Sequence, residues 1–200
     1  MLNFYENDSI EVALDEVGRG CLFGRVYTAA VIWPIDFDNS IHKINDSKKL
    51  SKKKRELLYN IIINNSIDWN INYIENDEID KLNILQSTIK SMHQNIDKLN
   101  LNIDHILVDG NYFKNYKNIK HTCCIKGDSK YCNIAAASIL AKVSHDNYIT
   151  NLCDIYPDLH EKYDLRNNMG YPTKKHIEGI KKYGITKYHR KTFGICTNYL

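Results

Sequence analysis

A short stretch near the start of the chain constrains the fold most, and it reads Leu14-Asp15-Glu16-Val17-Gly18-Arg19-Gly20. Neighbouring side chains on a regular strand point to opposite faces, so Asp15 and Glu16 can share a site only where the strand ends and glycine relaxes the backbone. Two carboxylates held together repel each other unless a cation lies between them. The stretch therefore predicts a strand that ends at a cation site.

The arginine between the two glycines adds a second signal. A guanidinium and the backbone N–H groups of such a turn would lie close to whatever the cation holds, and this combination suits a phosphodiester. An ordinary solvated turn beside an acidic pair is the competing interpretation, because both short patterns are common.

Two further carboxylates follow apolar segments. Asp109 ends the apolar stretch His105–Asp109, and Asp146 has apolar helical neighbours in the alanine-rich segment 133–153. A carboxylate on an apolar stripe is costly unless it is paired or bound to a cation. The alternatives are a plain Asp-Gly-Asn turn at Asp109 and an ion pair between Asp146 and Lys142.

The ordered set of motifs resembles ribonuclease HII, the type 2 ribonuclease H family, from about Val12 to Phe193. The motifs are Asp15-Glu16-Val17-Gly18-Arg19-Gly20, Asn45-Asp46-Ser47-Lys48-Lys49-Leu50-Ser51, Glu78-Ile79-Asp80-Lys81-Leu82-Asn83-Ile84-Leu85, Val108-Asp109-Gly110-Asn111, Lys126-Gly127-Asp128-Ser129-Lys130, the helix through Asp146, Gly170-Tyr171-Pro172-Thr173 and His189-Arg190-Lys191-Thr192-Phe193.

The resemblance implies that four carboxylates are both catalytic and metal-binding: Asp15, Glu16, Asp109 and Asp146. Oxygen ligands alone suit Mg²⁺ or Mn²⁺. A pair of such ions can activate a water and stabilise the leaving oxygen of an in-line displacement at phosphorus. The implied activity is metal-dependent endonucleolytic hydrolysis of the RNA strand of RNA–DNA hybrids, and incision at ribonucleotides embedded in duplex DNA, giving 5′-phosphate and 3′-hydroxyl ends.

The resemblance also implies substrate contacts. The Gly18-Arg19-Gly20 turn would recognise the ribose 2′-hydroxyl, which distinguishes RNA from DNA. Tyr163, seven residues before Gly170, is expected to stack on the sugar that follows the ribonucleotide; a half-buried aromatic is the alternative. The lysines expected to contact phosphate are Lys48, Lys49 and Lys126. His189 and Arg190 are expected to brace the C-terminal segment.

The order of predicted elements indicates an α/β fold with a ribonuclease H-like mixed β-sheet flanked by helices. We expect one catalytic domain over residues 1–200, with a C-terminal helical segment at about 157–200 packing on the same site. Strands are predicted at 11–16, 25–33, 66–75, 105–109 and 121–125. Helices are predicted from Ser51 to about Ile63, from Asp77 through Ile96, over 133–153, and between a Thr173 cap and Gly184.

Charge and composition set weaker limits. A net charge of +3 does not by itself indicate a nucleic-acid-binding protein, although lysines cluster at 48–55 and 174–191. Six cysteines without zinc spacing, and no apolar stretch that spans a bilayer, predict a cytoplasmic protein with reduced thiols and no membrane partner. We expect a monomer that lacks a C-terminal clamp-binding tail.

Two alternatives were weighed against this assignment. The sister family, ribonuclease HIII, is disfavoured because Arg19 retains the Gly-Arg-Gly form and no substrate-binding domain precedes residue 11. A non-catalytic module that binds RNA–DNA hybrids is disfavoured because pure binding gains nothing from clustered negative charge beside phosphates.

Overall fold

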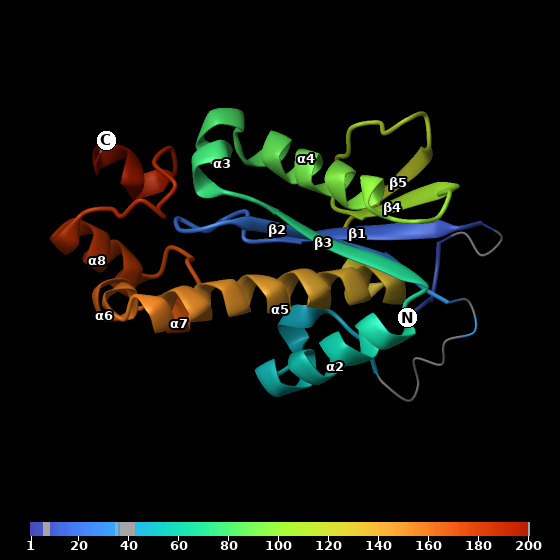
Figure 1. Cartoon of the computed structure of the whole chain (residues 1–200), viewed down its shortest axis with the longest axis horizontal. Coiled ribbons are helices and arrows are strands. Elements are labelled where there is room, and N and C mark those ends of the chain that lie inside the picture. The colour runs from blue at the N-terminus through green and yellow to red at the C-terminus, as the bar shows by residue number, and fades with distance from the viewer. Residues whose placement is uncertain (6–8, 35, 37–42, 200) are drawn as a thin grey trace.

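A mixed five-stranded sheet forms the centre of the protein in the computed structural model, which describes residues 1–5, 9–34, 36 and 43–199 (Figure 1). The strand order is β3-β2-β1-β4-β5. The strands are β1 (Glu11–Val17), β2 (Val26–Ile32), β3 (Asp68–Ile74), β4 (His105–Asp109) and β5 (Lys120–Cys124). The first three run antiparallel, whereas β1, β4 and β5 are parallel to one another. The predicted α/β class is confirmed.

The parallel pairing of β1 and β4 positions the functional residues. Leu14 pairs with Val108 as the last register pair. Asp15 and Asp109, the next residues of the two strands, therefore lie side by side at the same edge of the sheet. Both strands are apolar and buried up to this point, so the sheet holds their carboxyl ends firmly.

Helices cover both faces of the sheet (Figure 1). On one face lies α5 (Cys132–Ile155), whose alanine-rich N-terminal half packs closely on β1 and β2, with α2 (Lys52–Asn65) outside it. On the other face lies α4 (Ile84–Asp97), preceded by α3 (Asn76–Leu82). Ser51 caps α2 as predicted, because its hydroxyl accepts a hydrogen bond from the backbone N–H of Lys54.

The prediction of one continuous helix from Asp77 through Ile96 is wrong. The helix is broken at Asn83, which has a φ of 70°. Its side chain accepts a hydrogen bond from the backbone N–H of Gln86, and its own N–H donates to Ile79 O. Asn83 therefore ends α3 and caps α4 at once, a dual role that asparagine fills because it tolerates left-handed backbone.

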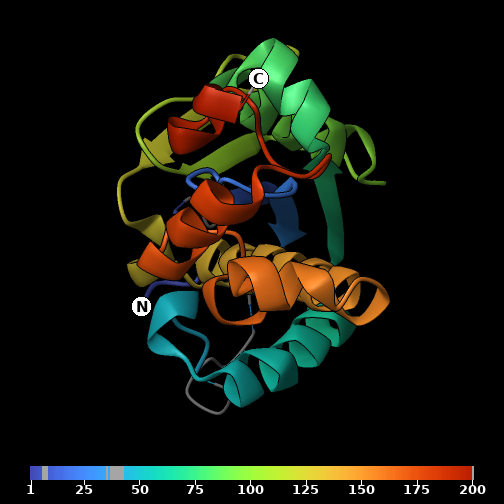
Figure 2. The ribbon, with the colours of Figure 1, turned by 90° about the vertical axis from the view of Figure 1, so that its left-hand side faces the viewer.

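The C-terminal segment packs beyond the far end of α5 (Figure 2). It contains α6 (Asp158–Tyr163), α7 (Leu165–Asn168), α8 (Lys174–Tyr183) and the 3₁₀ helix η3 (Gly194–Tyr199). Two further 3₁₀ helices, η1 (Ser47–Lys49) and η2 (Gly127–Ser129), border the site. The predicted start and stop of α8 are confirmed: Thr173 caps the N-terminus and Gly184 follows the last residue with a φ of 74°.

The six cysteines form no disulfide among the described residues. In this part of the chain we find no helix of the length and apolarity that crossing a bilayer requires.

Candidate active site

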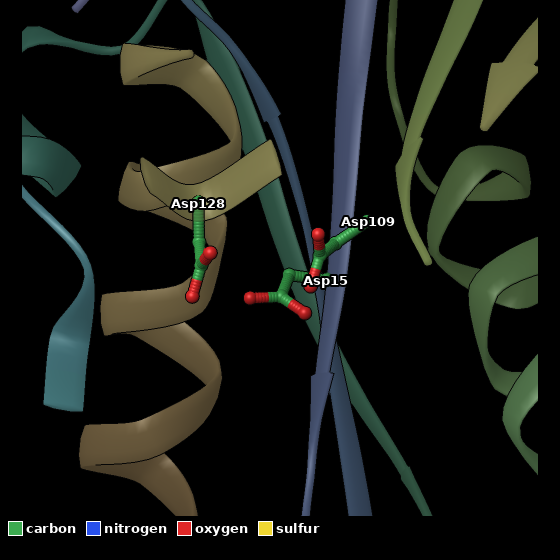
Figure 3. Close-up of side chains that lie close together, drawn as sticks. All are labelled: Asp15, Asp109 and Asp128. Carbon is green, nitrogen blue, oxygen red and sulfur yellow. The ribbon is translucent and has the colours of Figure 1, made fainter. Parts of the chain in front are cut away.

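Three aspartates meet at the edge of the sheet where β1 and β4 end. Asp15, Asp109 and Asp128 each offer a carboxylate oxygen, and these oxygens lie within 4.8 Å of one another. Figure 3 shows the three side chains converging from β1, from the end of β4 and from η2. Among the residues that the structure describes, this is the group whose donors could together hold a metal ion.

Asp128 reaches the cluster through the turn that follows β5. The backbone N–H of Gly127 donates to Asp109 Oδ1 at 2.7 Å, which fixes the turn against the end of β4. A Cβ atom at Gly127 would lie 2.4 Å from Ile134 Cδ1, so a larger residue there would require the Ile134 side chain to shift. The turn therefore places Asp128 beside Asp109, although the two are 19 positions apart in the sequence.

Glu16 lies beside the cluster and has its own partner. Its carboxylate accepts a hydrogen bond from the Arg19 guanidinium at 3.1 Å, and its backbone N–H donates to Asp15 Oδ1 at 2.7 Å. Asp15 and Glu16 nevertheless line the same cleft. The two carboxylates therefore share the cleft although β1 continues past them to Val17, and Glu16 is not part of the three-aspartate cluster.

The electrostatics of the cluster favour an added positive charge. Burial raises the pKa of Asp15 well above its usual value, and the charges of Glu16 and Asp109 raise it further. Burial also raises the pKa of Glu16, Asp109 and Asp128. These carboxylates are thus poorly compensated by the protein, and a bound cation would stabilise their ionised forms.

A cleft of about 370 Å³ opens over the cluster. Two lysines, Lys48 from η1 and Lys142 from α5, line it together with Tyr171. Ser138 also lines the cleft and is hydrogen-bonded to Asp15 and to Ser47. The cleft therefore combines a carboxylate floor with ammonium groups at its walls, an arrangement suited to a phosphate bridged to metal ions.

Asp146 does not join the cluster, contrary to its predicted place among the metal ligands. Its carboxylate accepts hydrogen bonds from Lys142 Nζ at 2.8 Å and from His145 Nδ1 at 3.1 Å, and Arg55 lies at 4.0 Å. Burial would raise its pKa, but the His145 hydrogen bond and the Lys142 charge outweigh burial and lower it. Asp146 is already compensated, as the ion-pair alternative anticipated.

The structure does not support the predicted contact between Tyr163 and the substrate. Its side chain is only 2% exposed, and its hydroxyl donates to Gly184 O within the C-terminal segment. Its ring packs edge-on against His189 at 4.9 Å. A buried ring cannot stack on a sugar, so Tyr163 is a packing residue.

Tyr171 occupies the position that had been expected for Tyr163. It lines the cleft, and its Cε1 atom would lie 3.8 Å from a Cβ atom at Gly20. The ring therefore packs against the Gly18-Arg19-Gly20 turn. The turn itself is tightly held: Gly18 has a φ of 88°, and a Cβ atom there would lie 3.0 Å from His145 Cδ2.

The predicted lysines differ in their placement. Lys48 lines the cleft, and its positive charge partly offsets the rise that burial causes in the pKa of Glu16, Asp109 and Asp128. Lys49 is exposed and is not among the residues that line the cleft. Lys126 is exposed in left-handed backbone at the start of η2, one residue before the glycine that binds Asp109.

Two residues of the site, Asp128 and Tyr171, belong to the sequence motifs but were not predicted to act there. A usable signal existed for Asp128, because it follows a predicted strand as Asp109 does, and parallel strands end at one edge. No such local signal marks Tyr171, whose position depends on how the C-terminal segment folds back onto the first turn.

Comparison with known proteins agrees with this geometry. Residues 12–196 match the family model described as Ribonuclease HII. A Ribonuclease HII of Christiangramia forsetii is 47% identical over 200 residues, covering 100% of this chain and 98% of that protein.

Solved structures share the fold. The ribonuclease H2 from Pyrococcus horikoshii OT3 superposes with a TM-score of 0.75 at 23% identity, covering 94% of this chain and 96% of that one. Bst-RNase HIII in complex with Mn²⁺ superposes with a TM-score of 0.67 at 16% identity, covering 87% of this chain and 62% of that one.

Proposed function

Because the chain belongs to the ribonuclease HII family, and is thus a ribonuclease H enzyme, we propose that it uses divalent metal ions to hydrolyse the RNA strand of RNA–DNA hybrids and to incise duplex DNA at embedded ribonucleotides. The products would carry 5′-phosphate and 3′-hydroxyl ends. The observation that carries the proposal is the Asp15–Asp109–Asp128 cluster beneath a cleft lined by lysines.

The donor set fits magnesium or manganese. All candidate ligands are carboxylate oxygens, three of them within 4.8 Å of one another, and neither sulfur nor imidazole joins them. Asp15, Asp109 and Asp128 would hold the ions, with Glu16 beside them. Two such ions, when bound, would supply an activated water and stabilise the leaving oxygen at phosphorus.

In this proposal Asp128, and not Asp146, is the fourth carboxylate of the metal site. The carboxylate of Asp128 has a raised pKa from burial and from Asp109, so it gains from a cation. The carboxylate of Asp146 has a lowered pKa because the protein's own cations already surround it. We infer that Asp146 orients Lys142, whose ammonium lies at the wall of the cleft.

The walls of the cleft supply substrate contacts from this chain. Lys48 and Lys142 would bind phosphate oxygens, which positions a strand without recognising its sequence. The Tyr171 ring packs against the Gly18-Arg19-Gly20 turn at the border of the cleft. We propose that the ribose lies over this contact, with its 2′-hydroxyl at the turn and the next sugar against the ring.

Cleavage-site mapping tests the proposal. A labelled duplex with one ribonucleotide should be cut at that ribonucleotide in Mg²⁺ or Mn²⁺ and left intact in EDTA. Asp109→Asn should lower kcat by ~10² to 10³ or more and retain hybrid binding, because the lost ligand acts in the transition state. Cleavage in EDTA, or near-normal turnover by Asp109→Asn in saturating Mg²⁺, would contradict the metal assignment.

A further inference from the structure

Arg190 is a fully buried arginine that binds backbone carbonyls. Its guanidinium donates to Gly24 O at 2.9 Å, to Arg19 O at 3.1 Å and to Arg25 O at 2.9 Å. Its side chain has 0% exposure. All three acceptors belong to the turn that joins β1 to β2, the same turn that carries the Gly-Arg-Gly motif. One side chain thus satisfies three carbonyls of the proposed ribose-binding loop.

The fork geometry of the guanidinium explains why arginine stands here. Its three nitrogens donate from three fixed points in one plane, whereas the single nitrogen of a lysine ammonium would have to reach all three carbonyls from one point. Removing the guanidinium would leave buried carbonyls without partners, and such groups are costly. The turn would then relax toward other conformations, two of its glycines having positive φ angles.

The preceding residue, His189, connects through His176 to the backbone of Tyr171. Its Nδ1 accepts a hydrogen bond from the backbone N–H of Thr186 at 2.9 Å, so in the neutral ring the proton lies on Nε2. That Nε2–H donates to His176 Nε2 at 3.2 Å. The proton of His176 is therefore on Nδ1, which donates to Tyr171 O at 2.9 Å. The chain of bonds fixes both tautomers and ends at the backbone of Tyr171.

Both rings stay neutral at physiological pH, which the chain of bonds requires. Burial lowers the pKa of His176, and burial together with the neighbouring His176 lowers the pKa of His189 to about 3. A second proton on His176 would turn the shared Nε2–Nε2 contact into a clash of two donors, and one on His189 Nδ1 would clash with the Thr186 N–H.

We propose that His189 and Arg190 are positioning residues that align the Gly18-Arg19-Gly20 turn with the Tyr171 ring that packs against it. Arg190 fixes the turn, and His189 fixes Tyr171 through His176. The proposal rests on the proposed function and deepens it, because it assigns the selectivity for ribose to a segment that touches neither metal nor substrate. Small displacements of a reacting group can cost about 10²-fold in rate, so the alignment of the turn and the ring matters.

The test uses paired variants of the full chain. Arg190→Gln and Arg190→Lys remove the three-carbonyl bridge, with Arg166→Gln as the control because Arg166 bonds an exposed partner, Asp154. His189→Asn retains an acceptor for the Thr186 N–H but cannot reach His176. Its control is His93→Asn on α4, which bonds Lys114 O.

Each protein is characterised in three experiments. Steady-state kinetics give kcat and KM on a duplex with one ribonucleotide and on a continuous hybrid. Calorimetry gives the Mn²⁺ affinity, and thermal denaturation gives the unfolding temperature. We expect the ratio of kcat/KM on the first substrate to that on the second to fall about 10-fold in the Arg190 variants and about 3- to 10-fold in His189→Asn, mainly through kcat. The Mn²⁺ affinity and both controls should stay unchanged.

An unchanged substrate ratio in variants that merely unfold at lower temperature would overturn the positioning role, and so would a failure of all three variants to fold. If the wild-type protein itself leaves the embedded ribonucleotide uncut, the proposed function fails. A wild type that cuts this substrate, with variants of unchanged ratio, contradicts only the positioning proposal.

Discussion

The aspartates of this protein behave differently because their neighbours differ. Asp128 sits among other carboxylates, and burial and the Asp109 charge raise its pKa. Asp146 sits among Lys142, His145 and Arg55. A carboxylate with a raised pKa destabilises the folded state when ionised, whereas one with a lowered pKa stabilises it. The two residues should therefore respond in opposite directions to neutralisation.

In metal-free protein at neutral pH, Asp128→Asn should raise the unfolding temperature because it removes repulsion from the cluster. Asp146→Asn should lower the free energy of unfolding by about 1–3 kcal/mol because it removes the negative charge that pairs with Lys142 and Arg55. Thermal denaturation in EDTA measures both. Equal signs for the two variants would contradict the division between ligand and ion-pair partner.

Two tyrosines can be separated by the same logic. Tyr171→Ala should remove stacking worth about 1–3 kcal/mol and lower cleavage at a single ribonucleotide more than cleavage of a continuous hybrid. Tyr163→Phe should cost about 1 kcal/mol of stability, through its hydrogen bond to Gly184 O, and leave substrate selectivity unchanged. The substrate ratio of kcat/KM decides, and a shift in Tyr163→Phe alone would restore the original assignment.

At the scale of single residues, the sequence predicts the residues whose position follows from a neighbouring apolar strand segment. Asp15, Glu16 and Asp109 were found this way, since each follows a run of apolar strand residues. Tyr163 and Asp146 were misassigned because their environments are built by distant segments: the C-terminal helices bury the first, and cations from α2 and α5 surround the second.

Among the elements, the break between α3 and α4 depends on one residue. Asn83→Ala should lower the free energy of unfolding by about 1–2 kcal/mol, because alanine loses the cap on α4 and disfavours a φ of 70°. Asn83→Gly, which keeps the backbone conformation, should cost only a few tenths of a kcal/mol. Urea unfolding compares them, and equal costs would show that the backbone conformation is unimportant.

The C-terminal segment should make stability depend on pH through His189. Its pKa is lowered to about 3 in the folded state, against about 6.5 in the unfolded chain. As the pH falls below about 6, the unfolded state gains a proton that folded His189 does not, so stability is lost, at up to about 1.4 kcal/mol per pH unit.

His189→Asn removes this titration from both states. Urea unfolding between about pH 6 and pH 4 should therefore show a shallower loss of stability in the variant than in the wild type. His93→Asn serves as the control. Identical slopes in the wild type and His189→Asn would indicate that the histidine is protonated without cost in the folded protein.

The periodicity of apolar residues predicted most helices and strands. Ser51, Thr173 and Gly184 also give local signals for where helices start and stop, and the structure confirms them. The periodicity merged α3 with α4, because apolar spacing continues across Asn83 and only the left-handed backbone there reveals the break. Short helices such as α6 and α7 have few turns of their own and are set by packing against α5.

The whole molecule has a modest net charge of +3, but its lysines are unevenly distributed along the chain. Lys48 reaches the cleft, whereas its neighbour Lys49 points elsewhere into solvent. Lys48→Gln should weaken binding of hybrids of unrelated sequence about equally and lower the salt slope of log Kd by about one unit. Lys49→Gln is the adjacent comparison, and an unchanged slope in Lys48→Gln would return this lysine to an ordinary solvated surface.

The order of strands in the sheet lay beyond local reasoning. Alternating elements predict a mixed sheet, but the order β3-β2-β1-β4-β5 follows from pairings between distant segments. The cluster of Asp15 with Asp128 depends on those pairings. No local pattern shows that the two residues are neighbours, so the motifs were identified through the family resemblance.

The bonds of Arg190 also have a consequence for biosynthesis. They span 165 to 171 residues of sequence, back to the turn after β1. At about 5–20 residues per second, a ribosome needs roughly 10–30 s to travel that distance. The turn emerges early and waits for its partner during this whole interval. A nascent chain therefore carries its carboxylates long before Arg190 can hold the turn, so the proposed ribose contacts form only after residue 190 has been made.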